Sequence, residues 1–283
     1  MKSILVPTDF SKNALNAVKY AFAYAEVTKS KVILFHSYDS PTSGLNIPFA
    51  DIHMDKNIAR QEAEKDMLKL QTSLSKSFPN VKQTWIVEAG FGADEITDYV
   101  SAKKIKLVIM GTTGQGALGR AFIGSTTSGV IADASCNVIV VPPKVKFKGI
   151  NKVGFATDIE EANLKLAFEA VAFTRQFSAR LTVIYVQDLK ISDVDATLRK
   201  MLDKVRKHTK YQNLSFYVGS DDSIANGLNL FIKKNKPDIL SMVTHSRKFP
   251  ETIWKKSWTK KMSYVISVPL LILHAKKPKN KDL

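Results

Sequence analysis

Glycine and hydroxyl residues gather after one apolar run in a pattern typical of an anion-binding loop. Residues 111–126, GTTGQGALGRAFIGST, include five glycines, follow the apolar run LVIM at 107–110, and end where a helix is expected from about Ser125. Glycines let main-chain N–H groups approach a phosphate closely, and a helix N-terminus adds unpaired donors. The carboxylate of Asp9, just after another apolar run, can accept hydrogen bonds from ribose hydroxyls. These groups together predict a nucleotide site.

The elements that must position these residues alternate between short apolar strands and longer amphipathic helices. Strands are expected at 2–7, 31–37, 82–88, 106–110 and 137–142. Helices are expected at 11–27, 56–78, 93–104 and from about 125, with a loop at 40–50. Continuous Val, Ile and Leu strands between helices indicate a parallel sheet covered on both faces. Asp9 and the glycine loop would then share the carboxyl edge of that sheet, where doubly wound folds bind ligands.

The pattern repeats in the second half of the chain. Residues 2–22 are echoed by 151–171, which pairs Asp9 with Asp158, and residues 124–141 are echoed by 256–273. The sequence therefore predicts an α/β protein with two doubly wound, five-stranded parallel-sheet domains, Rossmann-like and duplicated in tandem. The expected domains are 1–145, with the intact nucleotide motif, and 150–275, with a degenerate one, followed by a basic tail at 276–283.

Charge and composition limit the remaining classes of function. The net charge is +16, and residues 150–283 carry most of it, with 24 Lys and Arg against 13 Asp and Glu. Such a balance permits contact with nucleic acid, but no base-reading motif accompanies it, so nucleic acid is not the expected partner. The single cysteine, Cys136, is expected to be a small buried hydrophobe. No run is apolar enough to span a membrane and no signal-peptide core is found, so a cytoplasmic location is expected.

Other motifs that carry chemistry fit less well. Gly114, Gly116 and Gly119 satisfy G-x-G-x-x-G, but they follow the fourth strand rather than the first, and no suitable acidic residue follows them. Gly-Lys-Ser/Thr and G-x-S-x-G are absent, and the five histidines show no metal-ligand spacing. We therefore assign no catalytic residue and no metal ligand.

The chain resembles a tandem member of the universal stress protein family. That family's pattern G-x2-G-x9-G-[ST] is satisfied by Gly111, Gly114, Gly124 and Ser125. The segments ILVPTDFS and VILFHSYD are similar to the ends of the family's first two strands. The resemblance is strong over 1–143 and weaker over 150–275.

The resemblance implies binding of an adenine nucleotide, ATP or AMP/ADP, with or without Mg²⁺. Asp9 would contact ribose, the main chain of Ser37 adenine, and the glycine loop with Ser125 the phosphates. Ser37 departs from the family, which usually has an aliphatic residue there. The full set of expected site residues is Pro7, Thr8, Asp9, Ser37, Gly111, Gly114, Gly124, Ser125 and Thr126.

The corresponding positions of the second half have diverged. Val243, Ser246 and Lys256 replace the three motif glycines, although Ser257 and Asp158 are retained. Valine cannot easily adopt the backbone conformations open to glycine, and its side chain would crowd a phosphate. Tyr185 and Val186, in place of His36 and Ser37, change the adenine side as well. One nucleotide per chain is therefore expected.

The expected function is that of a nucleotide-binding regulatory protein of the stress response, which acts by binding rather than by catalysis. Two alternatives are a slow ATPase or autokinase phosphorylated at Ser125, and a nucleic-acid-binding stress factor that uses the basic second half. The two domains are expected to pack as an internal pseudo-dimer with strands 137–142 and 268–273 at the contact. A homodimer of two whole chains is compatible with this internal pairing.

Overall fold

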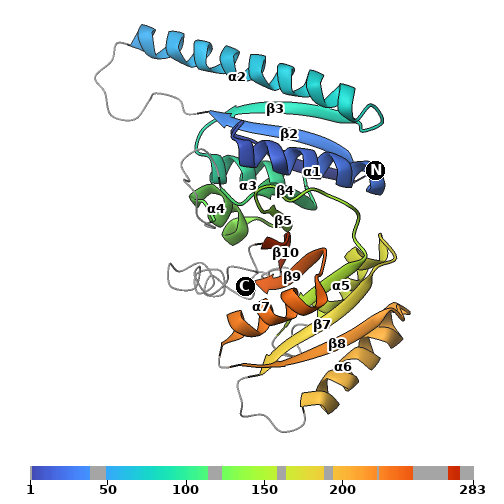
Figure 1. The fold of residues 1–283 in the computed structure, drawn as a ribbon. Helices are drawn as coiled ribbons and strands as arrows, with labels where there is room; N and C mark the ends of the chain where they lie inside the picture. Colours follow the sequence, from blue (N-terminus) through green and yellow to red (C-terminus); the bar gives the residue numbers. More distant parts are fainter. Residues whose placement is uncertain are drawn as a thin grey trace, which may run out of the picture.

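The protein is built on one continuous ten-stranded sheet with helices on both faces (Figure 1). The computed structural model describes residues 2–38, 49–113, 123–157, 164–187, 194–221, 223–244 and 267–274. The strand order is β3-β2-β1-β4-β5-β10-β9-β6-β7-β8, so each half of the chain contributes five strands in the same relative order.

The strands follow the apolar runs of the sequence closely. Their bounds are Ser3–Pro7 (β1), Lys31–Tyr38 (β2), Gln83–Ala89 (β3), Leu107–Gly111 (β4), Asn137–Val141 (β5), Lys152–Ala156 (β6), Arg180–Gln187 (β7), Leu214–Ser220 (β8), Ile239–Thr244 (β9) and Leu270–His274 (β10). Successive side chains of a strand point to opposite faces, so a run such as Ile4, Leu5 and Val6, all at most 1% exposed, requires cover on both faces.

The two halves meet through their last strands. β5 and β10 are antiparallel, with Leu271 opposite Ile139, whereas all other neighbouring strands in the described sheet are parallel. The prediction that these two strands lie at the contact is confirmed. The expected pair of five-stranded sheets is joined edge to edge into one sheet, which satisfies the main-chain groups that an edge strand would otherwise leave unpaired.

The helices lie between consecutive strands and cover the two faces. Their bounds are Lys12–Thr28 (α1), Phe49–Ser77 (α2), Gly92–Ala102 (α3), Ser125–Asp133 (α4), Leu164–Arg175 (α5), Val194–Thr209 (α6) and Ile224–Asn235 (α7). The sequence misplaced one start: α2 begins at Phe49, although a loop was expected to 50 and the helix from 56. Pro48 explains the difference, because a proline just before a helix is an ordinary start signal rather than part of a long loop.

Two cores fill the space between the sheet and its helices. The larger one continues across both halves, because Tyr24 of α1 packs on Phe173 of α5, on Phe177 just after that helix and on Phe147 between the halves. Cys136 is buried in the other core, and burial raises its pKa to about 12, so it is the buried thiol that was expected. Within the described residues, no helix is both long and apolar enough to cross a bilayer.

Candidate functional site

A cleft of about 510 Å³ lies beyond the carboxyl ends of β1 and β4. The strand order changes direction between these two strands, as at the ligand sites of doubly wound folds. The predicted residues that line the cleft are Pro7, Thr8, Asp9, Ser37, Gly111, Gly124, Ser125 and Thr126. The ninth, Gly114, lies outside the described residues.

One wall of the cleft is the turn between β1 and α1. The main-chain N–H of Thr8 donates to the carbonyl of Phe35 at 2.8 Å, which continues the ladder one residue beyond β1. The ring of His36 then fixes the turn, since its Nδ1 lies 2.8 Å from the Thr8 carbonyl oxygen and its face packs on Phe10. Oδ1 of Asp9 accepts a hydrogen bond from the N–H of Ser11 at 3.0 Å, so the carboxylate is oriented by the start of α1.

The opposite wall is the end of β4 and the start of α4. A Cβ placed on Gly111 would lie 3.2 Å from the carbonyl oxygen of Asn13, so glycine lets β4 pass close to α1. The hydroxyl of Thr127 donates to the Gly111 carbonyl at 2.9 Å, and the Asn13 amide donates to the Thr113 hydroxyl at 2.7 Å. These bonds tie the first turns of α1 and α4 to the same strand end.

The N-terminus of α4 opens on the cleft, and no acidic residue of its own first turn offsets its partial positive charge. Gly124 occupies the N-cap position without a side-chain cap, and the first turn contains no acidic residue. Ser125 and Thr126 are exposed and line the cleft. The first N–H groups of a helix have no intrahelical partner and carry partial positive charge. The first turn of α3, by contrast, contains Asp94 and Glu95. An anion in the cleft is therefore favoured at α4.

Sequence reasoning missed the contribution of the segment after β3. Gly90, Gly92 and Ile96 also line the cleft, beside Ser37 and Thr126. A Cβ on Gly92 would lie 3.2 Å from both the Ser37 hydroxyl oxygen and Cγ2 of Thr126. A signal was present in the sequence, because the G-x-G at 90–92 separates an expected strand from an expected helix.

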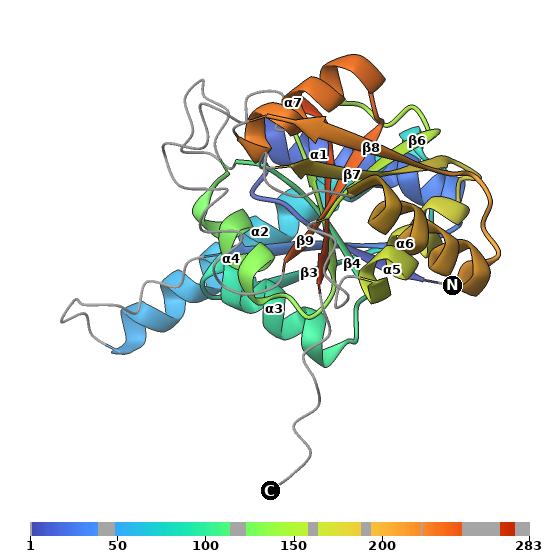
Figure 2. The ribbon, with the colours of Figure 1, turned by 90° about the horizontal axis from the view of Figure 1, so that it is seen from below.

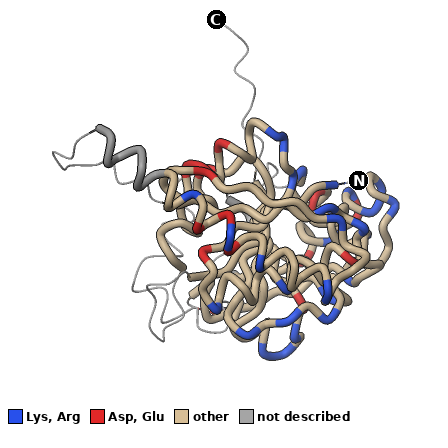
Figure 3. The backbone as a smooth tube through the Cα atoms, turned by 90° about the horizontal axis from the view of Figure 1, so that it is seen from above, with Lys and Arg blue, Asp and Glu red and all other residues tan. Residues whose placement is uncertain are grey.

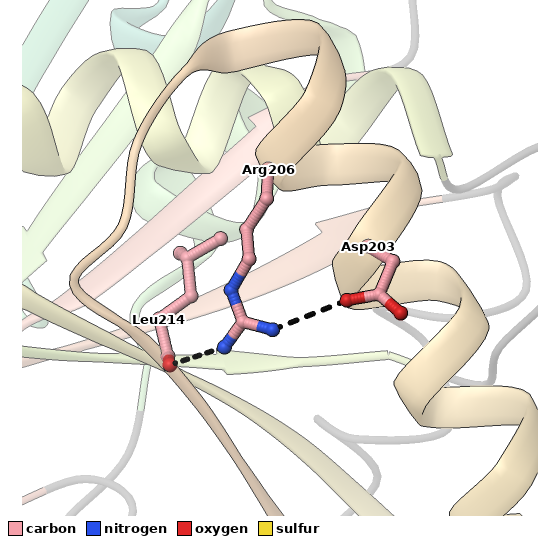
Figure 4. A network of polar contacts seen from close by, with 3 residues as sticks. All are labelled: Asp203, Arg206 and Leu214. Carbon is pink, nitrogen blue, oxygen red and sulfur yellow. Dashed lines mark hydrogen bonds and ion pairs between the residues drawn. The ribbon is translucent and has the colours of Figure 1, made fainter.

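The described lining of the cleft contains a single side chain that is charged at neutral pH, Asp9. Lys and Arg are instead spread over many turns and helix ends of the described chain (Figure 3). Some have structural partners: Arg206 of α6 contacts Asp203 at 3.3 Å and donates to the Leu214 carbonyl at 3.1 Å, which fastens α6 to β8 (Figure 4). Among the described residues, no three His, Cys, Asp or Glu side chains are grouped as a metal site would require.

The corresponding edge of the second half is packed differently. Val186 of β7 stands where β2 has Ser37, and its Cγ1 would lie 2.5 Å from a Cβ placed on Gly227 of α7. The valine therefore fills the space next to α7 down to the helix backbone. Val243, one residue before the end of β9, is opposite Leu273 of β10. Asp158, Ser246, Lys256 and Ser257 lie outside the described residues.

The fold and the cleft define a doubly wound α/β protein with a ligand-sized cleft at its switch point. The model of the Universal stress protein family matches residues 1–142, so the chain belongs to that family. The second half repeats the strand order of the first and joins it in one sheet.

Relatives carry the same family name. Universal stress protein MJ0531 of Methanocaldococcus jannaschii is 31% identical over 141 residues, which cover 50% of this chain and 81% of the relative. Universal stress protein E of Salmonella typhi is 28% identical over 134 residues, 46% of this chain and 42% of the relative. The crystal structure of a universal stress protein from Archaeoglobus fulgidus superposes with a TM-score of 0.72 at 16% identity and covers 97% of both chains. That likeness shows the fold of both halves.

Proposed function

We propose that the first half of the chain binds one adenine nucleotide in this cleft, and that the protein acts by binding, as a regulatory module of the stress response. The observation that carries the proposal is the convergence of eight predicted residues from four separate segments on one cleft beside the uncapped N-terminus of α4. A volume of about 510 Å³ lies within the usual range for small-molecule sites.

The chemistry of the lining supports a division of the cleft into three parts. Phosphates would accept hydrogen bonds from the main-chain N–H groups and hydroxyls of Ser125 and Thr126, where the α4 dipole favours negative charge. The Asp9 carboxylate would accept from the ribose hydroxyls. Adenine would lie against the apolar side chain of Ile96 and the main chain of Ser37. The gap that Gly92 leaves between Ser37 and Thr126 would be needed to join these parts.

The same lining bears on the identity of the nucleotide. No described Lys or Arg lines the cleft, so phosphate charge would be met by main-chain donors and, for a triphosphate, by Mg²⁺. The described oxygen donors suited to Mg²⁺ are the Asp9 carboxylate and the hydroxyls of Ser125 and Thr126. We propose ATP or AMP/ADP as the ligand, with Mg²⁺ accompanying ATP.

Binding is better supported than catalysis. General-base activation of a water or of Ser125 needs a group of suitable pKa within hydrogen-bond reach. Asp9 is the only carboxylate in the described lining, and one of its oxygens already accepts from Ser11. The autokinase alternative therefore lacks a second catalytic group among these residues.

The packing of the second half supports one site per chain. In the first half, the cleft is open beside α3. In the second half, the side chain of Val186 fills the corresponding space beside α7. We also propose that the antiparallel β5 and β10 pair serves as the contact of an internal pseudo-dimer, so that one chain supplies what two single-domain copies would supply.

The test is calorimetric titration of the full chain with ATP and with AMP at moderate salt. We expect a stoichiometry of one. Asp9→Ala and Gly124→Val should each weaken binding about tenfold or more, since a lost charge-assisted hydrogen bond costs about 1.5–3 kcal/mol. Asp133→Ala, at the far end of α4 and outside the cleft, is the matched control and should leave affinity unchanged. Two equal sites, or unchanged affinity in both cleft variants, would contradict the proposal.

A further inference from the structure

A second cavity, of about 270 Å³, lies between the two halves of the chain, away from the nucleotide cleft. Its first-half wall is formed at the starts of β1 and β4 and by α1, and its second-half wall by α5 and β10. The N-terminus and α5 lie on the same side of the molecule in Figures 1 and 2. None of its lining residues lines the nucleotide cleft.

The side chain of Tyr24 lines this cavity. Tyr24 is 2% exposed, and its ring is held by Phe147, Phe173 and Phe177. Its hydroxyl has no hydrogen-bond partner among the described residues. Burial raises the pKa of Tyr24 well above its usual value, so the phenol keeps its proton and remains a donor. The hydroxyl is not among the fully enclosed polar atoms, so a bound acceptor would replace its contact with water by a direct hydrogen bond.

Charges of both signs line the same cavity. Lys2 comes from the first half and Glu169 from the second, and neither forms an ion pair among the described residues. Lys106 adds a second positive charge at the start of β4. The rest of the lining mixes apolar residues, among them Phe173 and Leu271, with polar ones such as Asn137. The lining therefore carries positive charge from the first half, negative charge from the second half, and both apolar and uncharged polar side chains.

We propose that this cavity binds a small zwitterion, a free amino acid with an apolar side chain. Its carboxylate would contact Lys2 and accept a hydrogen bond from the Tyr24 hydroxyl, and its ammonium group would contact Glu169. The apolar side chain would lie against Phe173 and Leu271. A zwitterion offers an opposite charge both to Glu169 and to the lysines, which a ligand with only one charge cannot do, and the volume suits a molecule smaller than a nucleotide.

Calorimetric titration or saturation-transfer NMR on the full chain tests this proposal without reference to the nucleotide site. The probes are leucine, valine, isoleucine and phenylalanine, then 4-methylpentanoate and 3-methylbutylamine, which each lack one charge of leucine. At least one of the four amino acids should bind. The two single-charge analogues should bind about tenfold more weakly than leucine, since each loses one charge-assisted contact.

Two variants assign the binding to this cavity. Tyr24→Phe removes only a hydroxyl and Glu169→Gln only a charge, so both should fold, as circular dichroism can check. Each should weaken amino-acid binding about tenfold. Their controls, Tyr99→Phe on α3 and Glu26→Gln on α1, lie outside the cavity and should bind as the unaltered chain does. Absence of binding at millimolar amino acid, equal binding of 4-methylpentanoate, or unchanged binding in both cavity variants would overturn the proposal.

Discussion

At the scale of single residues, Gly92 gives the sharpest test of the cleft. A methyl group added there would lie 3.2 Å from the Ser37 hydroxyl oxygen and from Thr126, between the proposed adenine and phosphate positions. We expect Gly92→Ala to weaken adenine-nucleotide binding about tenfold, because crowding of a packed site typically costs 1–3 kcal/mol. Calorimetric titration with ATP measures the change.

Gly129 provides the matched control on the same pair of helices. Its added Cβ would lie 2.8 Å from Cβ of Ala93, outside the cleft. Gly129→Ala therefore crowds the contact of α3 with α4 and leaves the binding surface unchanged. The crowding is opposed by the better helix propensity of alanine, so the free energy of unfolding should change by no more than about 2 kcal/mol. Equal losses of affinity in the two variants would mean that Gly92 acts only through packing.

The sequence could predict most of the cleft because its residues lie in two short motifs. The spacing from Gly111 to Ser125 and the position of Asp9 each indicate a strand end at the same sheet edge. Gly92 was missed because its role depends on how closely α3 approaches α4, which no local pattern encodes. Val186 was suspected from its place in the repeat, but its contact with Gly227 required the packing of α7.

At the scale of elements, the helix ends show an unusual choice of residue. α1 and α7 both end on a lysine in the left-handed conformation, Lys29 with φ 53° and Lys236 with φ 48°. The N–H of each donates back to the last turn, to Ala25 and Ile232 respectively. Glycine is the usual residue at such a position, because it has no Cβ to oppose a positive φ.

We therefore expect Lys29→Gly and Lys236→Gly to raise the free energy of unfolding by about 1 kcal/mol each. Lys29→Ala and Lys236→Ala are the controls, since they remove the charge and keep the Cβ, and they should show no such gain. Urea denaturation followed by circular dichroism separates the two. If the alanine variants were stabilised as much as the glycine variants, charge rather than backbone conformation would be the cause.

At the scale of the whole molecule, the repeat predicted two five-stranded sheets. In the structure these sheets pair along their edges and form a single ten-stranded sheet. The apolar character of 137–142 and 268–273 indicated strands that need cover on both faces, and the duplication indicated that equivalent strands would meet. The antiparallel register, with Leu271 opposite Ile139, could not be read from either run. Aromatic contacts between residues far apart in the sequence, such as Tyr24 of α1 with Phe177 just after α5, accompany this register across the junction.

The antiparallel pair of β5 and β10 contains a partly buried histidine, His274, that makes the stability of the chain sensitive to acid. The residue ends β10, its N–H lies 3.4 Å from Oδ1 of Asn137 in β5, and burial lowers its pKa to about 4. A lowered folded-state pKa means that the unfolded chain binds the proton first. Stability from this group is therefore complete above the unfolded pKa of about 6.5 and is lost as pH falls toward 4.

The expected loss from His274 between pH 7 and pH 4 is about 3 kcal/mol, since each unit of pKa difference corresponds to about 1.4 kcal/mol. The glutamine of His274→Gln takes up no proton in this pH range. The free energy of unfolding of the variant should therefore fall by about 3 kcal/mol less than that of the unaltered chain between pH 7 and pH 4. Urea denaturation at several pH values measures both curves. Because β10 joins the halves, the acid effect should appear in the unfolding of both, and parallel pH curves for the variant and the unaltered chain would rule out His274 as its source.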